Sequence, residues 1–225
     1  MYGSDLVGRG AFALHLFARS GGEGQSLPQE RHQHQQHSHS DDALLDGIAE
    51  LLVAAVARRE ALGLVGPLTV DDYYKHLADL LADAERGDAG LIAAVGPDGA
   101  VLGSAQWTRS PYATRRVLGE LDRVSVAPEA RGLGVGRAMV DRIAVDASAH
   151  GIELLMLEAR GNNHGAIALY ERCDFVRTGS LPNAVAEGPA RHDVIFMCHE
   201  LGRAEDAQLH GSDAVGAGAS TLRQH

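Results

Sequence analysis

The residues of this chain whose types and spacing could do chemistry gather in two short stretches of its second half. The first stretch runs from Arg131 to Arg137, RGLGVGR, and places three alternating glycines between two arginines. Apolar residues then recur four apart, which predicts a helix that begins inside the glycines and runs to His150. Glycine allows a ligand to approach the backbone closely, and the unpaired N–H groups and dipole of a helix start attract anions. The stretch therefore predicts an anion site, with a pyrophosphate as the natural guest.

Two common nucleotide motifs do not fit this turn. The dinucleotide motif GxGxxG would need a glycine where Arg137 stands, and the GK[ST] ending of the Walker motif is absent. Instead, R-G-x-G-x-G after V-x-P resembles the acyl-CoA site of the GCN5-related N-acetyltransferases, whose coenzyme contains a pyrophosphate. Taken alone, a glycine-rich turn before a helix is just as often a tight connection, so a second motif is needed.

The second stretch, from Asn163 to Phe175, reads NHGAIALYERCDF. Asn163 suits a helix cap, and Ala166 and Tyr170 then lie four apart on one helical face. This resembles the N-x-x-A-x-x-L-Y-E-x-x-G-F signature of the same family, with Asp174, which also tolerates left-handed geometry, in place of the usual glycine. Two motifs in this order make the chain similar to the family over roughly Ala11–Leu201.

The resemblance implies acetyl-CoA as co-substrate and Tyr170 as the general acid toward the coenzyme sulfur. A phenol suits that task because it keeps its proton at neutral pH, although an aromatic packed in the core would look the same in sequence. The resemblance also implies that the oxyanion meets the backbone N–H of Val126, where the family's strands splay apart. The positions implied to bind the coenzyme are Val124, Ser125, Val126, Arg131, Gly132, Leu133, Gly134, Val135, Gly136, Arg137, Asn163, Ala166 and Tyr170.

Two glutamates compete for the role of general base. Strand alternation would put Glu120 on the same side as Val126, facing the coenzyme, at the position where histone acetyltransferases of this superfamily carry their base. Glu158 ends the next strand, and LEARGNN resembles the stretch where ribosomal-protein N-terminal acetyltransferases carry theirs. Either could act through a water, and either could instead pair with Arg123 or Arg160. The sequence leaves both open.

The elements that position these residues are predicted in the order β-α-α-β-β-β-α-β-α-β-β, an α/β fold with one mixed sheet flanked by helices, as in the resembled family. Two amphipathic helices follow the first strand, and in that fold they wall the acceptor site, so Tyr73, Tyr74 and His76 become candidates for substrate contact or for plain packing. A mobile loop over the active site is predicted at 179–191. Bounds are predicted for six of the seven strands, at 11–17, 91–95, 100–108, 114–126, 154–157 and 192–200. The two amphipathic helices are predicted at 41–63 and 69–87.

One domain is predicted from the length of 225 residues. The expected parts are an N-terminal segment with the first strand (1–18), a His/Gln-rich linker (19–40), the acyltransferase core (41–201) and a flexible tail (202–225). The histidines of the linker could in principle bind a transition metal, but no cysteine or carboxylate accompanies them inside the run, so a solvated linker without a catalytic role is favoured. No metal is expected in the site.

Composition excludes some classes of protein. A net charge of −10 argues against a nucleic-acid binder and is compatible with a cationic amine substrate. Cys173 and Cys198 are too few for a disulfide framework and are expected as reduced thiols in a cytoplasmic enzyme. No membrane segment is expected, because no apolar stretch is long enough. A homodimer is compatible with the sequence.

These inferences predict an N-acetyltransferase that transfers the acetyl group of acetyl-CoA directly to an amine, through a ternary complex. A small-molecule amine is the first choice for the acceptor, because the acidic balance and the extra N-terminal segment do not suggest a docking groove for one protein. A protein N-terminus is the second, as for the ribosomal-protein enzymes. A non-catalytic acyl-CoA-binding sensor is the alternative from another class.

Overall fold

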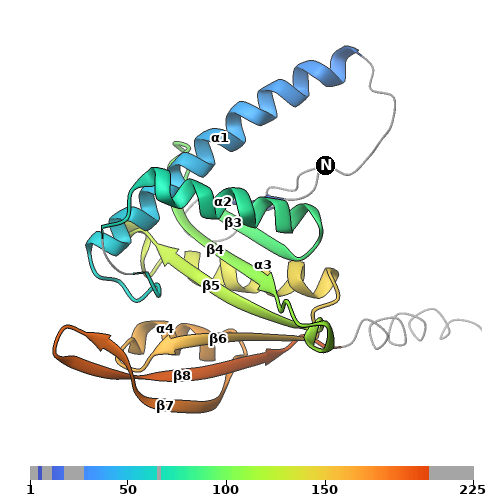
Figure 1. The fold of residues 1–225 in the computed structure, drawn as a ribbon. Coiled ribbons are helices and arrows are strands. Elements are labelled where there is room, and N and C mark those ends of the chain that lie inside the picture. The colour runs from blue at the N-terminus through green and yellow to red at the C-terminus, as the bar shows by residue number, and fades with distance from the viewer. Residues whose placement is uncertain (1–4, 7–11, 18–27, 65–66, 203–225) are drawn as a thin grey trace, which may run out of the picture.

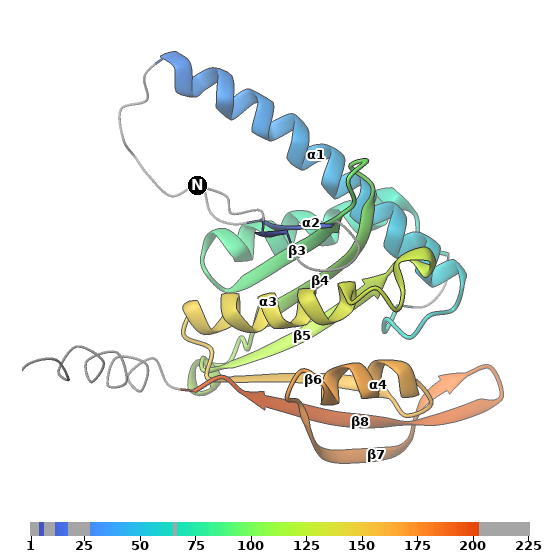
Figure 2. The same ribbon diagram turned by 180° about the vertical axis from the view of Figure 1, so that it is seen from behind.

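The computed structural model describes residues 5–6, 12–17, 28–64 and 67–202. They form one mixed sheet with α1 and α2 on one face and α3 and α4 on the other (Figures 1 and 2). The predicted order of elements is confirmed, with a further two-residue strand at the start. In chain order the elements are β1 (Asp5–Leu6), β2 (Ala13–Phe17), α1 (Pro28–Ala57), α2 (Val70–Glu85), β3 (Ala89–Val95), β4 (Val101–Arg109), β5 (Leu118–Val126), α3 (Val135–Ala149), β6 (Leu154–Arg160), α4 (His164–Glu171), β7 (Val176–Glu187) and β8 (Ala190–Glu200), with 3₁₀ turns at Ala113–Arg115 and Pro128–Ala130.

The sheet has the strand order β1-β2-β3-β4-β5-β6-β8-β7, and β5–β6 is its parallel pair. That pair is short: Leu118–Glu120 aligns with Leu154–Met156, and no pairing between β5 and β6 continues beyond these residues. The remainder of β5 stays paired with β4, and the remainder of β6 with β8. The sheet therefore opens between β5 and β6, and this opening positions the candidate site.

Each face of the sheet has its own apolar core. On the α3 side, Met139 and Ile143 are fully buried, as the four-residue spacing predicts. On the other side, Ile48 of α1 and Leu77 of α2 are buried against β3. Each such side chain contributes roughly 1.5–3 kcal/mol when fully buried, so the two layers hold the helices firmly against the strands. Thr69 caps α2 in a capping box: its side chain accepts from Asp72 N–H, and the Asp72 side chain accepts from Thr69 N–H.

A bulge in β5 corrects the expected direction of Glu120. Ser104 aligns with Ser125 but Gln106 aligns with Asp122, so β5 has one residue more than β4 at this point, and Arg123 there has a φ of 48°. An extra residue inverts the alternation of side chains along a strand. Glu120 and Asp122 consequently face the α1–α2 side, while Val124 and Val126 pack against the core on the α3 side. The prediction that Glu120 faces the coenzyme side is wrong.

Three expected boundaries also change. Helix α1 begins at Pro28, so 28–40, expected as a solvated linker, continue the helix; proline at a first helical position has its φ preset for a helix. The strand expected from Thr114 begins at Leu118, after a 3₁₀ turn. The loop expected at 179–191 is instead the β7–β8 hairpin, in which the pairing of the two strands supplies the order that Gly, Pro and Asn obscure in the sequence. Within the expected parts, residues 1–4, 7–11, 18–27, 65–66 and 203–225 lie outside the described residues.

Candidate active site

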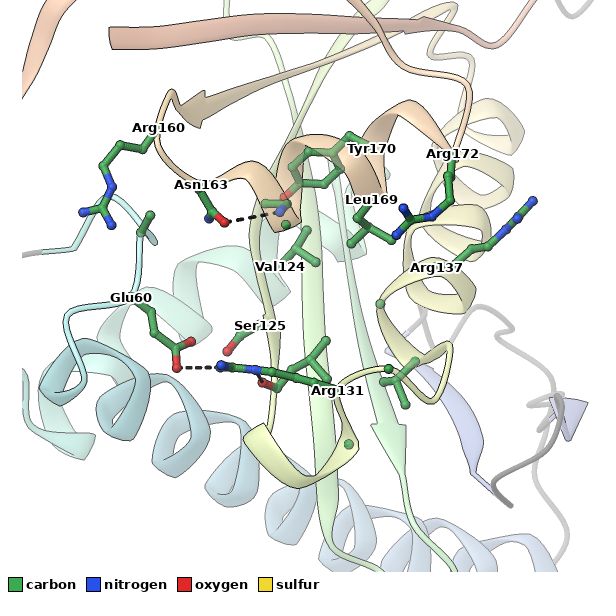
Figure 3. A pocket seen from close by; sticks show the side chains of 18 of the residues that line it. Glu60, Val124, Ser125, Arg131, Arg137, Arg160, Asn163, Leu169, Tyr170 and Arg172 are labelled. Atoms are coloured by element: carbon green, nitrogen blue, oxygen red, sulfur yellow. Dashed lines mark hydrogen bonds and ion pairs between the residues drawn. The ribbon is translucent and has the colours of Figure 1, made fainter. Parts of the chain in front are cut away.

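A cavity of about 840 Å³ opens where β5 and β6 part, on the side of α3 and α4 (Figure 3). Its lining carries five arginines and a single carboxylate, Glu60, although the chain as a whole has a net charge of −10. The cavity is therefore suited to a polyanion. The lining residues are Arg59, Glu60, Ala61, Val124, Ser125, Val126, Ala130, Arg131, Gly132, Gly134, Val135, Gly136, Arg137, Arg160, Asn162, Asn163, Gly165, Ala166, Leu169, Tyr170 and Arg172.

The glycine turn presents an anion cradle to this cavity. Gly132 and Gly134 have φ values of 78° and 87°, which L side chains rarely adopt, and a Cβ at either position would meet no atom within 4 Å. Gly134 is the N-cap of α3, and its carbonyl accepts from Ala138 N–H at 3.0 Å. The N–H groups of the first helical turn consequently have no acceptor within the helix, and they point toward the space that the glycines leave open.

Gly136 serves a different purpose in the same turn. A Cβ at this position would lie 3.1 Å from Cδ2 of Leu169 and 3.5 Å from Cγ2 of Val126. Glycine therefore permits α3, α4 and β5 to meet closely at the floor of the cavity. Leu133, between the first two glycines, is 53% exposed and does not line the cavity, so its side chain takes no part.

The end of β5 offers a free backbone edge to the same space. Ala127 N–H donates to Leu102 O of β4 at 2.8 Å, and in an antiparallel pair successive residues alternate in direction. The N–H and C=O of Val126 consequently point away from β4, into the opening between β5 and β6. This is the geometry that an oxyanion donor or an extended ligand backbone requires.

Tyr170 reaches from α4 toward Val124 on β5 (Figure 3). Asn163 caps α4, as predicted, by accepting from Ala166 N–H at 3.2 Å, and this fixes the start of the helix that carries the tyrosine. The Tyr170 ring is 9% exposed and packs against Phe175. Burial, and then the negative charge of Asp122, raise the pKa of the Tyr170 phenol above its ordinary value, so the phenol is protonated at neutral pH.

Arg131 spans the mouth of the cavity instead of pointing into the glycine turn. Its Nε donates to Val126 O at 3.1 Å, and its Nη2 donates to Oε1 of Glu60, between α1 and α2, at 2.6 Å. Arg58 donates to the same carboxylate at 2.7 Å. Burial alone would raise the pKa of Glu60, but the hydrogen bonds from Arg58 and Arg131 bring it below its usual value, so the carboxylate is charged at neutral pH.

A second cavity of about 560 Å³ lies on the other side of the opening. It is bounded by the segment after α1, by the end of β6 and by the β7–β8 hairpin. The two cavities share four lining residues: Arg59, Glu60, Ala61 and Arg160. The second cavity is lined by Val56, Arg59, Glu60, Ala61, Gly63, Leu64, Glu158, Ala159, Arg160, Val185, Ala186, Glu187, Gly188 and Val194.

Both candidate bases face this second side. Glu158 lines the second cavity. Glu120 lines neither cavity, but it is aligned with Met156 of β6, two residues before Glu158, and is close enough to be repelled by the Glu158 carboxylate. Partial loss of hydration, then repulsion from Asp122 and Glu158, raise the pKa of Glu120. Among the described residues, neither glutamate forms an ion pair with Arg123 or Arg160: Arg123 pairs with Asp122 at 3.0 Å, and Arg160 with Glu187 at 3.0 Å.

The predicted coenzyme residues thus come together, apart from the side chain of Leu133, whereas the two glutamates lie across the sheet from them. None of Tyr73, Tyr74 and His76 lines either cavity. Tyr73 is 2% exposed in the core, and Nε2 of His76 lies 2.8 Å from Nη1 of Arg123. Sequence reasoning did not place Arg59, Glu60, Arg160, Arg172 and Glu187 in the site. Three of them, Arg59, Glu60 and Glu187, lie in segments that no motif covers, whereas Arg160 and Arg172 lie within the motif stretches.

Comparison with known proteins fits this geometry. The model of the acetyltransferase (GNAT) family matches residues 47–175, more than half of the chain. The chain belongs to this family. Among its relatives, a mycothiol acetyltransferase of Propionibacterium freudenreichii is 30% identical over 127 residues, 56% of this chain and 39% of that protein. A ribosomal protein bS18-alanine N-acetyltransferase of Escherichia coli K12 is 34% identical over 86 residues, 37% of this chain and 58% of that protein.

Solved GNAT structures share the fold. A phosphinothricin acetyltransferase from Sinorhizobium meliloti, in complex with AcCoA, superposes with a TM-score of 0.63 at 22% identity, over 70% of this chain and 83% of that one. The chain spans only 28% and 39% of the first two mycothiol acetyltransferases that it matches. Within the described helices, none is both long and apolar enough to cross a membrane.

Proposed function

We propose that this chain is an N-acetyltransferase that transfers the acetyl group of acetyl-CoA directly to an amine of a small molecule. The observation that supports it best is the parting of β5 and β6. There the free edge of Val126, the N-terminus of α3 and Tyr170 all face one arginine-lined cavity. Coenzyme A is an extended polyanion with a pyrophosphate in its middle, and the open glycine turn with its unpaired N–H groups suits that group.

Acyl transfer to an amine needs a base, an oxyanion donor and an acid, and the chain offers a candidate for each. Glu120 or Glu158 would take a proton from the ammonium group through a water, which frees the nitrogen lone pair. As the C–N bond forms, the Val126 N–H would donate to the carbonyl oxygen. As the C–S bond breaks, the Tyr170 hydroxyl would give its proton to the sulfur, and the nitrogen would lose its second proton to the resulting phenolate through water. Holding both reactants in the opening between the strands adds the gain of proximity.

The second cavity supports a small acceptor. Its volume of about 560 Å³ falls within the usual range of small-molecule sites, and the carboxylates of Glu158 and Glu187 can meet an ammonium group. A protein N-terminus is the second candidate, which the ribosomal-protein relative and the placement of Glu158 at the end of β6 favour. Thiol release with a panel of diamines and amino-acid amides, against a peptide with a free N-terminal alanine, separates the two.

A thermal-shift titration with acetyl-CoA, coenzyme A, ATP and NAD tests the coenzyme. A ligand at a hundred times its dissociation constant stabilises by roughly 2.7 kcal/mol, which is about 5 to 10 °C for a chain of this length. We expect that shift with the two coenzyme A compounds alone. No shift with them, or a larger one with NAD, would refute the acetyltransferase proposal. Binding of acetyl-CoA without thiol release from any amine would instead indicate a sensor.

A further inference from the structure

We propose that Glu60 is a positioning residue that competes with the coenzyme pyrophosphate for Arg131. The inference rests on the proposed coenzyme site. The two residues form a bridge across the mouth of the cavity, from the segment after α1 to the end of β5 (Figure 3). Coenzyme binding opens that bridge, and release of the coenzyme allows it to close again.

The first support is the direction of the Arg131 side chain. Arg131 directly precedes the glycine turn, so its guanidinium is one residue away from the open anion cradle at Gly132 and Gly134. The guanidinium nevertheless bonds Glu60 Oε1 and Val126 O, both at the opposite end of the cavity mouth. Arginine binds phosphate by the same planar fork with which it binds carboxylate, so it cannot serve both groups at once.

The second support is what the bridge covers. Val126 O belongs to the backbone edge that points into the β5–β6 opening, and Arg131 Nε occupies it. A coenzyme whose amides pair with this edge would displace the arginine from Val126, while its pyrophosphate would attract the freed guanidinium toward the turn. The amides and the pyrophosphate of the coenzyme would thus both favour opening of the bridge between Arg131 and Glu60.

The third support is the anchoring of Glu60. Its carboxylate is the only one among the described residues that line the cavity, and five arginines share that lining. Arg58 also donates to it, at 2.7 Å, so a second contact would keep the acceptor in place when Arg131 leaves and allow it to recapture the arginine. Glu60 is 22% exposed and Arg131 51%, and a pair this accessible is weak enough for a phosphate to break.

Calorimetric titration of coenzyme A into a double-mutant set tests the competition. We expect Glu60→Gln to tighten binding about two- to fivefold, the range for partly exposed ion pairs, because Arg131 is then free for the pyrophosphate. Arg131→Gln should weaken binding about tenfold. In the Arg131→Gln background, Glu60→Gln should then leave the affinity unchanged. Glutamine keeps the shape of glutamate, so the effect isolates the charge.

A matched control measures the effect of removing one negative charge near the turn without breaking the bridge. Glu129 is an exposed carboxylate two residues before Arg131 that does not line the cavity, so Glu129→Gln should change affinity less than Glu60→Gln. Arg131→Lys provides a second background if Arg131→Gln fails to fold, because lysine lacks the fork that joins Glu60 and Val126. Stopped-flow measurement should show slower release of coenzyme A from Glu60→Gln.

The outcomes separate this inference from the proposed function. Weaker or unchanged binding by Glu60→Gln, or an equal gain with and without Arg131, would overturn the competition while leaving the coenzyme site intact. If the wild-type protein itself binds no coenzyme A, the proposed function fails first and the competition fails with it.

Discussion

The two cavities on either side of the β5–β6 opening are built in opposite ways. The arginine-lined cavity draws most of its residues from two continuous stretches, 124–137 and 160–172, each of which is a strand end, a turn and a helix start. The second cavity is assembled from the segment after α1, the end of β6 and the β7–β8 hairpin, which lie far apart in the chain. A coenzyme that a whole family shares can be bound by local backbone geometry, whereas a particular acceptor would be bound by side chains from separate segments.

The largest expected effect tests the local geometry of the first cavity. Gly134→Val should weaken coenzyme A binding by ~10²-fold or more, because valine is strained at a φ of 87° and its side chain would enter the anion cradle. Gly151→Val is the matched control, since Gly151 has a φ of 77° and equally open space but follows the far end of α3. It should lose similar stability and bind coenzyme A normally. Equal affinities in the two variants, measured by calorimetry, would show that the glycine turn is only a connection.

The next effect concerns Tyr170, which lines the first cavity and is the candidate proton donor in the reaction. Tyr170→Phe should lower kcat by ~10²-fold or more, with the dissociation constant of coenzyme A unchanged, because the variant loses a proton donor and little packing. Tyr112→Phe, at a side chain that is 64% exposed, is the control and should turn over at the wild-type rate. Steady-state kinetics with the best amine of the panel provides the measurement. A Tyr170→Phe enzyme at full speed would remove the phenol from the mechanism.

The smallest expected effect is a shift in the pH profile, and it distinguishes the roles of Glu120 and Glu158. If Glu120 is the base, kcat/KM should rise with pH through a value above that of an ordinary glutamate, because lost hydration and repulsion from Asp122 and Glu158 raise its pKa. Glu158→Gln removes one source of repulsion, so turnover should persist while the rise of kcat/KM (the acid limb of the pH profile) moves to lower pH. Glu120→Gln should abolish the limb together with most of the rate. The reverse assignment follows if Glu158→Gln is the variant that loses activity.

The same contrast explains how far the sequence could be interpreted. The RGLGVGR turn, the Asn163 cap and the buried face of α3 all follow from contacts within a few residues, and these predictions agree with the structure. The face on which Glu120 lies depends on one extra residue in β5 relative to β4, which no alternation within β5 reveals. Arg59 and Glu60 join the cavity because a segment distant in the chain folds against it, so only the tertiary structure could bring them to the site.

The hairpin and the long first helix were missed for related reasons. β7 is an exposed edge strand whose hydrogen bonds come from β8, so it shows no apolar alternation of its own. In 28–40 the polar composition that indicated a linker is also compatible with helix, and the helix is continuous with the buried part of α1. In both cases the neighbouring element, and not the segment's own pattern, decides the structure.

The bulge at Arg123 divides β5 into two halves whose even-numbered side chains face opposite sides of the sheet. Residues before it, such as Glu120 and Asp122, contribute to the side where the acceptor would lie, and residues after it, from Val124 to Val126, contribute to the coenzyme side. A substitution on one half can therefore act mainly on one side of the sheet, although both halves belong to a single strand of nine residues and the charge of Asp122 still reaches the Tyr170 phenol. Substitutions in the first half, whether by evolution or by design, could therefore change which amine is acetylated while the acetyl donor stays the same.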